Sequence, residues 1–166
     1  MAIEQTVLAE ITSKFERDLT KEKFSTCITD RLACSRGTCP YEFKWLEQGQ
    51  YPYIPDIVVW PESTEDVVTV VKAAACHKIS VIPYGGGSGI VGGTVPKHGG
   101  IVIDMKRMTN LSINDINLTV TAGAGCNGQH LEDELNRQGY TMGHFPQSIH
   151  SATVGGWVAP IAIGTF

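Results

Sequence analysis

A run of glycines between two apolar segments constrains this chain more than any other feature. Residues 83–93 read PYGGGSGIVGG, with six glycines in eleven residues, and they follow the apolar run ISVIP. Only TVPKHGG separates these glycines from the next apolar run, IVIDM at 101–105. A helical crossover between parallel strands needs about a dozen residues or more, so we expect a loop that joins two strands. Because ordered glycine loses much backbone entropy, the loop needs a compensating role.

The same run contains a G-x-G-x-x-G match, GSGIVG at 87–92, which is the pattern of the Rossmann dinucleotide-binding turn. That turn requires a helix directly after its glycines, with the helix N-terminus facing the pyrophosphate. Here a β-branched pair, a proline and two more glycines follow, and no G-K-[ST] ending of a Walker A motif is present. Both phosphate-binding motifs are therefore excluded.

Two interpretations of the loop remain. Successive main-chain N–H groups in turn conformations can form a nest for an anion without a lysine, and the length of this loop fits a diphosphate. The alternative is a mobile surface loop, which glycine also permits. Ile90 and Val91 disfavour that alternative, because a flexible connector rarely carries two β-branched apolar residues.

Hydrophobic periodicity predicts an α/β (α+β) fold. Apolar residues spaced by four indicate a first helix, and they are Ile3, Val7, Ile11 and Phe15. PDIVVWP (55–61) and ISVIP (79–83) are predicted strands, and the helix between them begins with a capping box at Ser63 and Asp66. Residues 20–50 follow no clear pattern.

The second half repeats strand and helix signals. IVIDM and LTVTAGAG (118–125) are the third and fourth predicted strands. Asn127 and Gly139 are expected to cap a helix between them, and a short strand is expected before residue 143. We expect an incomplete mixed sheet in this part.

Composition excludes several classes of protein. A net charge of −4 and the absence of a basic run argue against a nucleic-acid partner. No apolar run reaches the roughly 18 residues of a transmembrane segment, and the acidic start lacks a signal peptide, which predicts a cytoplasmic protein. Five cysteines without a C-x-x-C pair predict free thiols. Cys34, Cys39 and a histidine have weak spacing for a metal site, so none is expected.

The end of the chain carries no Asp, Glu, Lys or Arg after Arg137. Its apolar, glycine-rich stretch SATVGGWVAPIAIGTF has no charged groups to place in solvent. This pattern predicts an N-terminal fragment of a longer protein.

Several motifs in one order resemble the FAD-linked oxidases with a PCMH-type FAD-binding domain. These motifs are PDIVVWPESTEDV, PYGGGSG, IDM-x-R-M, and GHFPQS with SATVGGW, and they run from about Pro55 to Ala159. The family includes D-lactate dehydrogenase, the glycolate oxidase flavoprotein subunit and alkyldihydroxyacetonephosphate synthase. The resemblance implies FAD between two small lobes, the second incomplete. It places a helical or irregular segment at 1–50 and the FAD-binding domain at 51–166.

The resemblance also implies which residues bind FAD. Main-chain amides of the first loop would wrap the pyrophosphate, in the segment Pro83, Tyr84, Gly85, Gly86, Gly87, Ser88 and Gly89. A second set would lie along the flavin and its ribityl chain, and it comprises Gly143, His144, Pro146, Gln147, Ser148, Thr153, Gly155 and Gly156. His144 fits a structural role equally well. Replacement of Gly86 by valine is expected to abolish FAD retention, by placing a side chain where the phosphates approach.

The family implies a flavoprotein oxidoreductase that oxidises a small 2-hydroxy acid, of the D-lactate or glycolate type, by hydride transfer to FAD. One alternative is an alkyldihydroxyacetonephosphate synthase-like reaction, which the GH-x-P and GGWVA motifs favour. That branch commonly continues with Thr/Ala-Arg-Ala, where this chain has Pro160, Ile161 and Ala162. Another alternative is a non-catalytic FAD-binding piece. The substrate would reach FAD through a missing cap domain or a partner chain, so no catalytic residue is assigned here.

Overall fold

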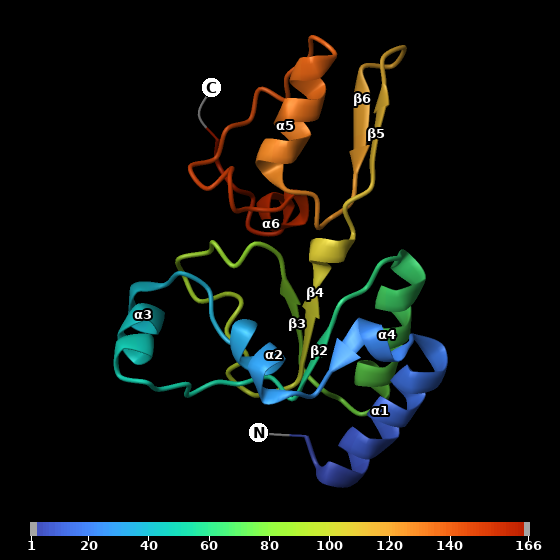
Figure 1. The fold of residues 1–166 in the computed structure, drawn as a ribbon, viewed down its shortest axis with the longest axis vertical. Coiled ribbons are helices and arrows are strands. Elements are labelled where there is room, and N and C mark those ends of the chain that lie inside the picture. Colours follow the sequence, from blue (N-terminus) through green and yellow to red (C-terminus); the bar gives the residue numbers. More distant parts are fainter. Residues whose placement is uncertain (1–2, 165–166) are drawn as a thin grey trace.

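The computed structural model describes residues 3–164, which form two lobes stacked along the long axis of the molecule (Figure 1). The lower lobe contains α1 (Gln5–Asp18), η1 (Lys21–Lys23), β1 (Phe24–Ser25), α2 (Ile28–Ala33), α3 (Pro40–Glu47), β2 (Ile57–Val59), α4 (Thr64–Cys76), β3 (Val81–Tyr84), β4 (Ile101–Asp104) and the 3-10 helix η2 (Met105–Arg107). The upper lobe contains β5 (Leu111–Asn114), β6 (Thr119–Ala122), α5 (Gly128–Arg137) and α6 (Val154–Val158).

The lower lobe is built on a four-stranded sheet with the order β1-β2-β4-β3. β4 is parallel to both of its neighbours, and Val102 pairs with Val58 on one side and with Ile82 on the other. β1 adds an antiparallel edge strand to β2. All four residues of β4 are buried, as expected for a central strand with both faces covered.

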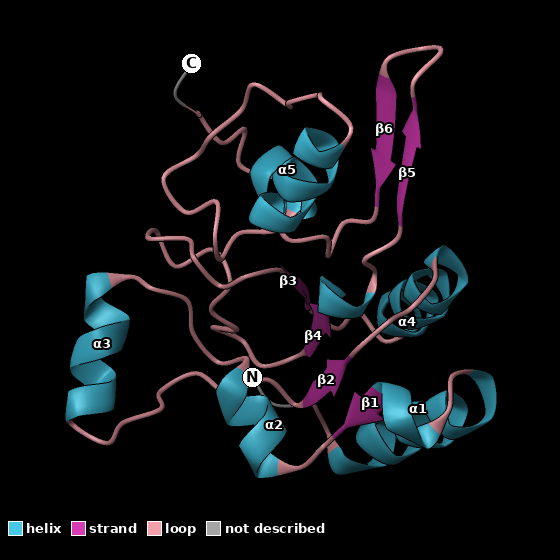
Figure 2. Cartoon of the chain, turned by 45° about the horizontal axis from the view of Figure 1, so that its top comes forward, coloured by secondary structure: helices cyan, strands magenta, loops and turns pink. Residues whose placement is uncertain are grey.

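Helices cover the two faces of this sheet (Figure 2). On one face Phe15 of α1 and Val70 of α4 pack against Ile57 and Ile101 in a single core cluster. On the other face Cys34 packs on the sheet directly after α2. The capping box is confirmed, because the Ser63 side chain accepts the Asp66 N–H at 3.1 Å.

The upper lobe consists of an antiparallel hairpin, β5–β6, with α5 packed against it. The Asn127 side chain caps α5 by accepting the His130 N–H at 3.1 Å. Gly139 follows the helix with φ at +79°, as a left-handed C-terminal glycine does. Where a mixed sheet was expected, the described residues form an antiparallel pair.

The short strand expected before residue 143 is wrong. Residues 140–146 are irregular, because the buried carboxylate of Glu132 accepts hydrogen bonds from the Thr141 hydroxyl and the Met142 N–H. These bonds replace the ladder that a strand would make.

Three expectations about the whole chain can be compared with the described residues. All five cysteines are free, as predicted. No helix within residues 3–164 is both long enough and apolar enough to cross a membrane. In the same part of the chain, no group of three or more His, Cys, Asp or Glu residues is arranged to hold a metal ion.

Candidate cofactor-binding site

The glycine loop, defined here as residues 85–94, leaves the sheet at the carboxyl ends of its parallel strands. β3 and β4 both end at this edge, where open α/β sheets bind ligands. From there the loop runs between α6 and the connection from α2 to α3 (Figure 1). The site therefore lies where the two lobes meet.

The main-chain N–H groups of the glycine loop are free. No N–H from Gly85 to Thr94 donates a hydrogen bond to another group within residues 3–164. Buried or half-buried N–H groups are rarely left without a partner in folded proteins. Gly87 is buried and Gly86 is half-buried, so the loop presents donors that a bound anion can satisfy.

The second loop, residues 146–156, packs directly on the first. A Cβ at Gly85 would overlap Thr153 Oγ1, and a Cβ at Gly86 would overlap the Ser151 carbonyl oxygen. The structure thus brings together the two glycine-containing segments that the sequence singled out. It also corrects the reason given for the effect of Gly86→Val, because the side chain would strike the second loop instead of a phosphate.

Many polar groups of the second loop are already hydrogen-bonded within the protein. Thr153 Oγ1 caps α6 by accepting the Gly156 N–H at 3.2 Å, and the Gly155 N–H donates to Ala124 O at 2.9 Å. Ser148 O accepts the N–H groups of Ser151 and Ala152. The hydroxyl protons of Ser148 and Thr153 remain available to donate.

The remaining predicted residues of the second set differ in their surroundings. The His144 ring meets the Trp157 ring edge to face, with centroids 5.2 Å apart. Pro146 is buried and accepts the Ile149 N–H, while Gln147 and Gly143 are exposed. His144 thus has a structural contact, with a tryptophan that is itself buried, at 6% exposed.

Two ionisable groups beside the glycine loop are held in their neutral forms. Burial raises the pKa of the Tyr84 hydroxyl to about 12, with the charges of Cys34 and Asp104 acting in the same direction. Burial, with the nearby Asp104, raises the pKa of the Cys34 thiol to about 11. Neither group is suited to act as a base at neutral pH.

Lys106 places a cation at this edge of the sheet. Lys106 Nζ is 3.0 Å from Asp104 Oδ2 and 4.9 Å from the centre of the Tyr84 ring. Asp104 is buried, whereas the Lys106 side chain is 49% exposed. The sequence around Lys106 does not reveal that this lysine lies beside Tyr84. The contact depends on the parallel pairing of β3 and β4, which brings residues 84 and 104 together.

Sequence reasoning missed the residues behind the loop. Tyr84 donates its hydroxyl to Arg36 O at 3.0 Å, and Thr38 N donates to Gly89 O at 3.3 Å. Both contacts come from residues 36–38, in the region that showed no periodic pattern.

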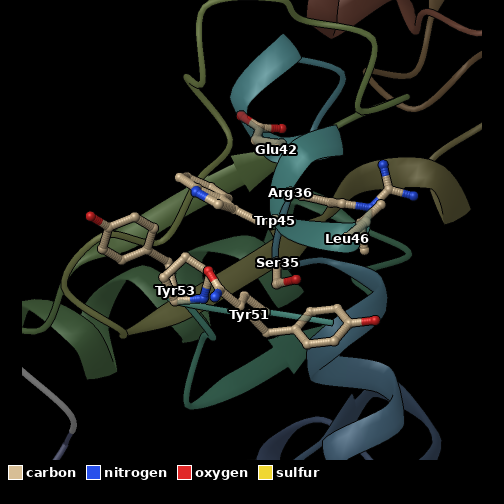
Figure 3. Close-up of a pocket in the computed structure, with 9 residues that line it drawn as sticks. Ser35, Arg36, Glu42, Trp45, Leu46, Tyr51 and Tyr53 are labelled. Carbon is tan, nitrogen blue, oxygen red and sulfur yellow. The ribbon is translucent and has the colours of Figure 1, made fainter. Parts of the chain in front are cut away.

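The pocket shown in Figure 3 lies on the α3 side of the lower lobe. It is lined by side chains that include Trp45, Tyr51 and Tyr53. A second pocket lies at the opposite edge of the sheet and is lined by His77, Ser80 and other residues. Neither pocket includes a residue of the glycine loop, so the candidate site is the loop surface itself.

Comparisons with known proteins bear on this site. The family described as "FAD binding domain" matches residues 55–166. Alkyldihydroxyacetonephosphate synthase of Caenorhabditis elegans is 38% identical over 149 residues, which cover 87% of this chain and 25% of that protein. D-lactate dehydrogenase of Archaeoglobus fulgidus is 37% identical over 108 residues, which cover 65% of this chain and 24% of that protein.

A solved structure of alkyldihydroxyacetonephosphate synthase superposes with a TM-score of 0.87 at 29% identity, and the match covers 93% of this chain and 30% of that one. The chain therefore spans about a quarter of the length of the curated relatives it matches.

Proposed function

Because the chain belongs to the family of FAD binding domains, we propose that its glycine loop receives the diphosphate of FAD. The observation that carries this proposal is the continuous set of free N–H donors from Gly85 to Thr94. Such donors form a nest for an anion, at the strand edge where ligands bind in related α/β sheets. A bound flavin supplies the redox or adduct chemistry of such proteins.

The chain's own residues would bind and orient this cofactor. The N–H groups of residues 85–89 donate to phosphate oxygens, and the exposed Gly89 leaves room for close approach, since a Cβ there would meet no atom within 4 Å. The Ser148 hydroxyl and the exposed Gln147 amide make no hydrogen bond with another described group and can donate toward the flavin. Thr153 holds α6 in place and offers its hydroxyl proton.

For the reaction of the whole protein we propose alkyldihydroxyacetonephosphate synthase-like chemistry. The support is sequence identity over a long match: the synthase is 38% identical over 149 residues, whereas D-lactate dehydrogenase is 37% identical over 108 residues and a glycolate oxidase subunit 31% over 136. The solved synthase structure superposes with a TM-score of 0.87 at 29% identity. Oxidation of a small 2-hydroxy acid is the second candidate. In both cases groups outside this chain would contact the substrate, through a cap domain or a partner chain.

Binding of FAD in competition with ADP tests the placement of the diphosphate. We expect the protein to bind FAD, and we expect ADP to displace it while riboflavin, which lacks phosphates, does not. Failure of ADP to compete at any concentration would contradict a diphosphate site in the glycine loop.

Anaerobic mixing of the flavin-loaded whole protein, with its cap domain or partner chain, with D-lactate or glycolate separates the two reactions. Bleaching of the visible flavin band by either acid would favour the 2-hydroxy acid oxidase. A retained band, together with a spectral shift on adding an alkylated or acylated dihydroxyacetone phosphate, is the result expected for the synthase-like reaction.

A further inference from the structure

We infer that Glu42 is a positioning residue for the glycine loop, acting through a main-chain bracket formed by residues 36–38. The bracket turns loop carbonyl groups to the rear and thereby leaves the N–H groups facing the ligand side. For its effect on cofactor affinity, the inference rests on the proposed binding of FAD. Glu42 and the bracket both lie outside the matched family segment, 55–166.

Glu42 fixes the bracket through a buried hydrogen bond. It lies on α3, its residue is 2% exposed, and its Oε2 accepts the Gly37 N–H at 2.5 Å. Its second oxygen, Oε1, faces the loop and would be 3.4 Å from a Cβ at Gly92. A buried carboxyl group is costly without hydrogen bonds, so this contact ties the position of Gly37 to α3.

The bracket in turn bonds one carbonyl group of the loop and lies close to a second. Thr38 N lies 3.3 Å and Thr38 Oγ1 3.4 Å from Gly89 O. A Cβ at Gly37 would be 3.0 Å from Gly89 O and 3.1 Å from Gly87 O, which is closer than side chains normally approach. Glycine at position 37 therefore permits the bracket to lie directly against the rear of the loop.

The residue that leads into the loop is tied to the same bracket. Tyr84 donates its hydroxyl to Arg36 O at 3.0 Å, and that hydroxyl packs against Gly87. Gly87 has φ at +67°, a conformation that glycine adopts without strain. Tyr84 is thus a spacer between the bracket and the turn of the loop.

Because the peptide bond is planar, fixing a carbonyl group also fixes the direction of the N–H group of the next residue. In a trans peptide, the C=O of one residue and the N–H of the next point in opposite directions. With Gly89 O bonded to the bracket and Gly87 O close to it, the N–H groups of Ile90 and Ser88 point to the other side. The bracket thereby directs these two donors away from itself.

Asp56 provides a matched control. Its Oδ2 accepts the Gly100 N–H at 2.7 Å, and the residue is 7% exposed. The chemistry is that of the Glu42–Gly37 pair, a buried carboxyl group bonded to a glycine N–H. Asp56 precedes β2, however, and so lies at the amino ends of the parallel strands, opposite to the glycine loop.

The test compares Glu42→Ala, Glu42→Gln and Asp56→Ala by equilibrium titration with FAD, thermal unfolding without ligand, and the amide resonances of residues 85–94. We expect Glu42→Ala to weaken FAD binding roughly ten- to a hundredfold, as loss of a buried hydrogen bond to a carboxyl group permits, and to shift the loop resonances. Glu42→Gln retains an acceptor oxygen and should restore most of the affinity. Asp56→Ala should lower the unfolding temperature without weakening FAD binding.

Gly37→Ala is an independent variant, because its methyl group would push on Gly87 O and Gly89 O while Glu42 stays intact. Should Glu42→Ala fail to fold, Gly37→Ala decides. Unchanged FAD affinity in Gly37→Ala, or an equal loss in Asp56→Ala, would overturn the positioning role and leave the proposed function standing.

Absence of FAD binding by the unsubstituted protein is a different outcome and overturns the proposed function. The positioning of the glycine loop by the bracket is then tested only by the amide resonances of residues 85–94. If these shift in Glu42→Ala and Gly37→Ala but not in Asp56→Ala, the positioning of the loop is supported; if they shift in none, it is refuted.

Discussion

The two glycine-containing loops pack against each other but have opposite hydrogen-bonding states. In the glycine loop, no N–H from Gly85 to Thr94 donates to another described group. In the second loop, Gly155 and Gly156 donate to Ala124 O and Thr153 Oγ1. The glycine loop is bonded from behind, by the bracket, and its N–H groups stay free of partners among the described residues. The second loop instead uses its N–H groups to bond to itself and to residues 124–126. The two loops therefore differ in where their N–H groups are directed.

Glycine also has different uses in the two regions. Gly89 faces open space, where a Cβ would meet no atom within 4 Å, so close approach of a ligand is possible there. In the upper lobe a Cβ at Gly128 would overlap the Trp157 ring. One glycine therefore leaves space for a ligand, and the other allows the core to close.

Replacement of Gly86 by valine should have the largest effect, because this residue joins the two regions. Its side chain would overlap Ser151 O, and overpacking of this kind costs about 1–3 kcal/mol or more. We expect both a lower unfolding temperature and loss of FAD binding, measured by thermal unfolding and FAD titration. A variant as stable as the wild type would show that the two loops do not pack as described.

Replacement of Gly128 by alanine should destabilise the upper lobe. Its methyl group would overlap the Trp157 ring, and we expect a loss of about 1–3 kcal/mol in the free energy of unfolding, measured by urea denaturation. Gly49→Ala is a surface comparison, although its positive φ of +63° adds some strain. Equal stability of wild type and Gly128→Ala would contradict the packing role.

Replacement of Gly89 by valine should separate binding from stability. Because the new side chain meets no protein atom within 4 Å of its Cβ, we expect an almost unchanged unfolding temperature. It would occupy the face offered to the diphosphate, so FAD affinity should fall at least about tenfold, or about 1.4 kcal/mol. FAD titration at matched protein concentration measures this, and unchanged affinity would move the cofactor away from Gly89.

Replacement of Thr153 by alanine tests how much one hydrogen bond contributes to the stability of the second loop. It removes the cap of α6, in which Oγ1 accepts the Gly156 N–H at 3.2 Å. Loss of such a cap typically costs about 1 kcal/mol, so urea denaturation should show a small decrease in stability. Thr153→Ser keeps the oxygen and should behave like the wild type. A decrease of equal size in Thr153→Ser would point to the methyl group and not the cap.

Alkaline pH should weaken the lower lobe slightly. The pKa of Cys34 rises from 9.0 to about 11 in the folded protein, so its contribution to stability is complete below pH 9 and is lost as the pH approaches 11. Tyr84 acts in the same direction, from 10.0 to about 12. The unfolding temperature should therefore fall above pH 9, and the fall should be smaller in Cys34→Ala. A fall of the same size in that variant would assign the effect to Tyr84 or another group.

Much of the architecture could be predicted because local signals and tertiary packing agree. The strands at 57–59, 81–84 and 101–104 and the capped helices α4 and α5 follow hydrophobic patterning and cap residues directly. The family, the α/β fold and FAD as the family's cofactor are confirmed by the match over residues 55–166 and by the solved synthase structure.

The missed elements are short and are stabilised by distant contacts. β1 has two residues and exists because it pairs with β2, and β5 forms opposite β6 without a strong pattern of its own. The irregular stretch at 140–146 depends on Glu132, a contact that no local propensity reveals. The domain boundary near residue 50 stays a prediction; Phe15, which precedes it, shares a core cluster with Ile57.

The cofactor-binding residues also stay predictions, although the structure limits what each can do. Free donors in the glycine loop follow from the bracket, which sequence patterns did not reveal. Conversely, the N–H groups of Gly155 and Gly156 are already bonded within the protein. The sequence motifs of the two loops predict that these segments lie together. The hydrogen bonds within the protein determine which of their N–H groups remain free to bind a ligand.

Binding of FAD by the glycine loop is tested by the visible absorption spectrum of the desalted protein, recorded before FAD is added and again after FAD is added and the excess removed. We expect the wild type to retain a flavin band and to release FAD on denaturation, and we expect a much weaker band in Gly89→Val. A folded wild-type protein that retains no flavin after FAD is added would contradict the claim that the glycine loop holds a diphosphate.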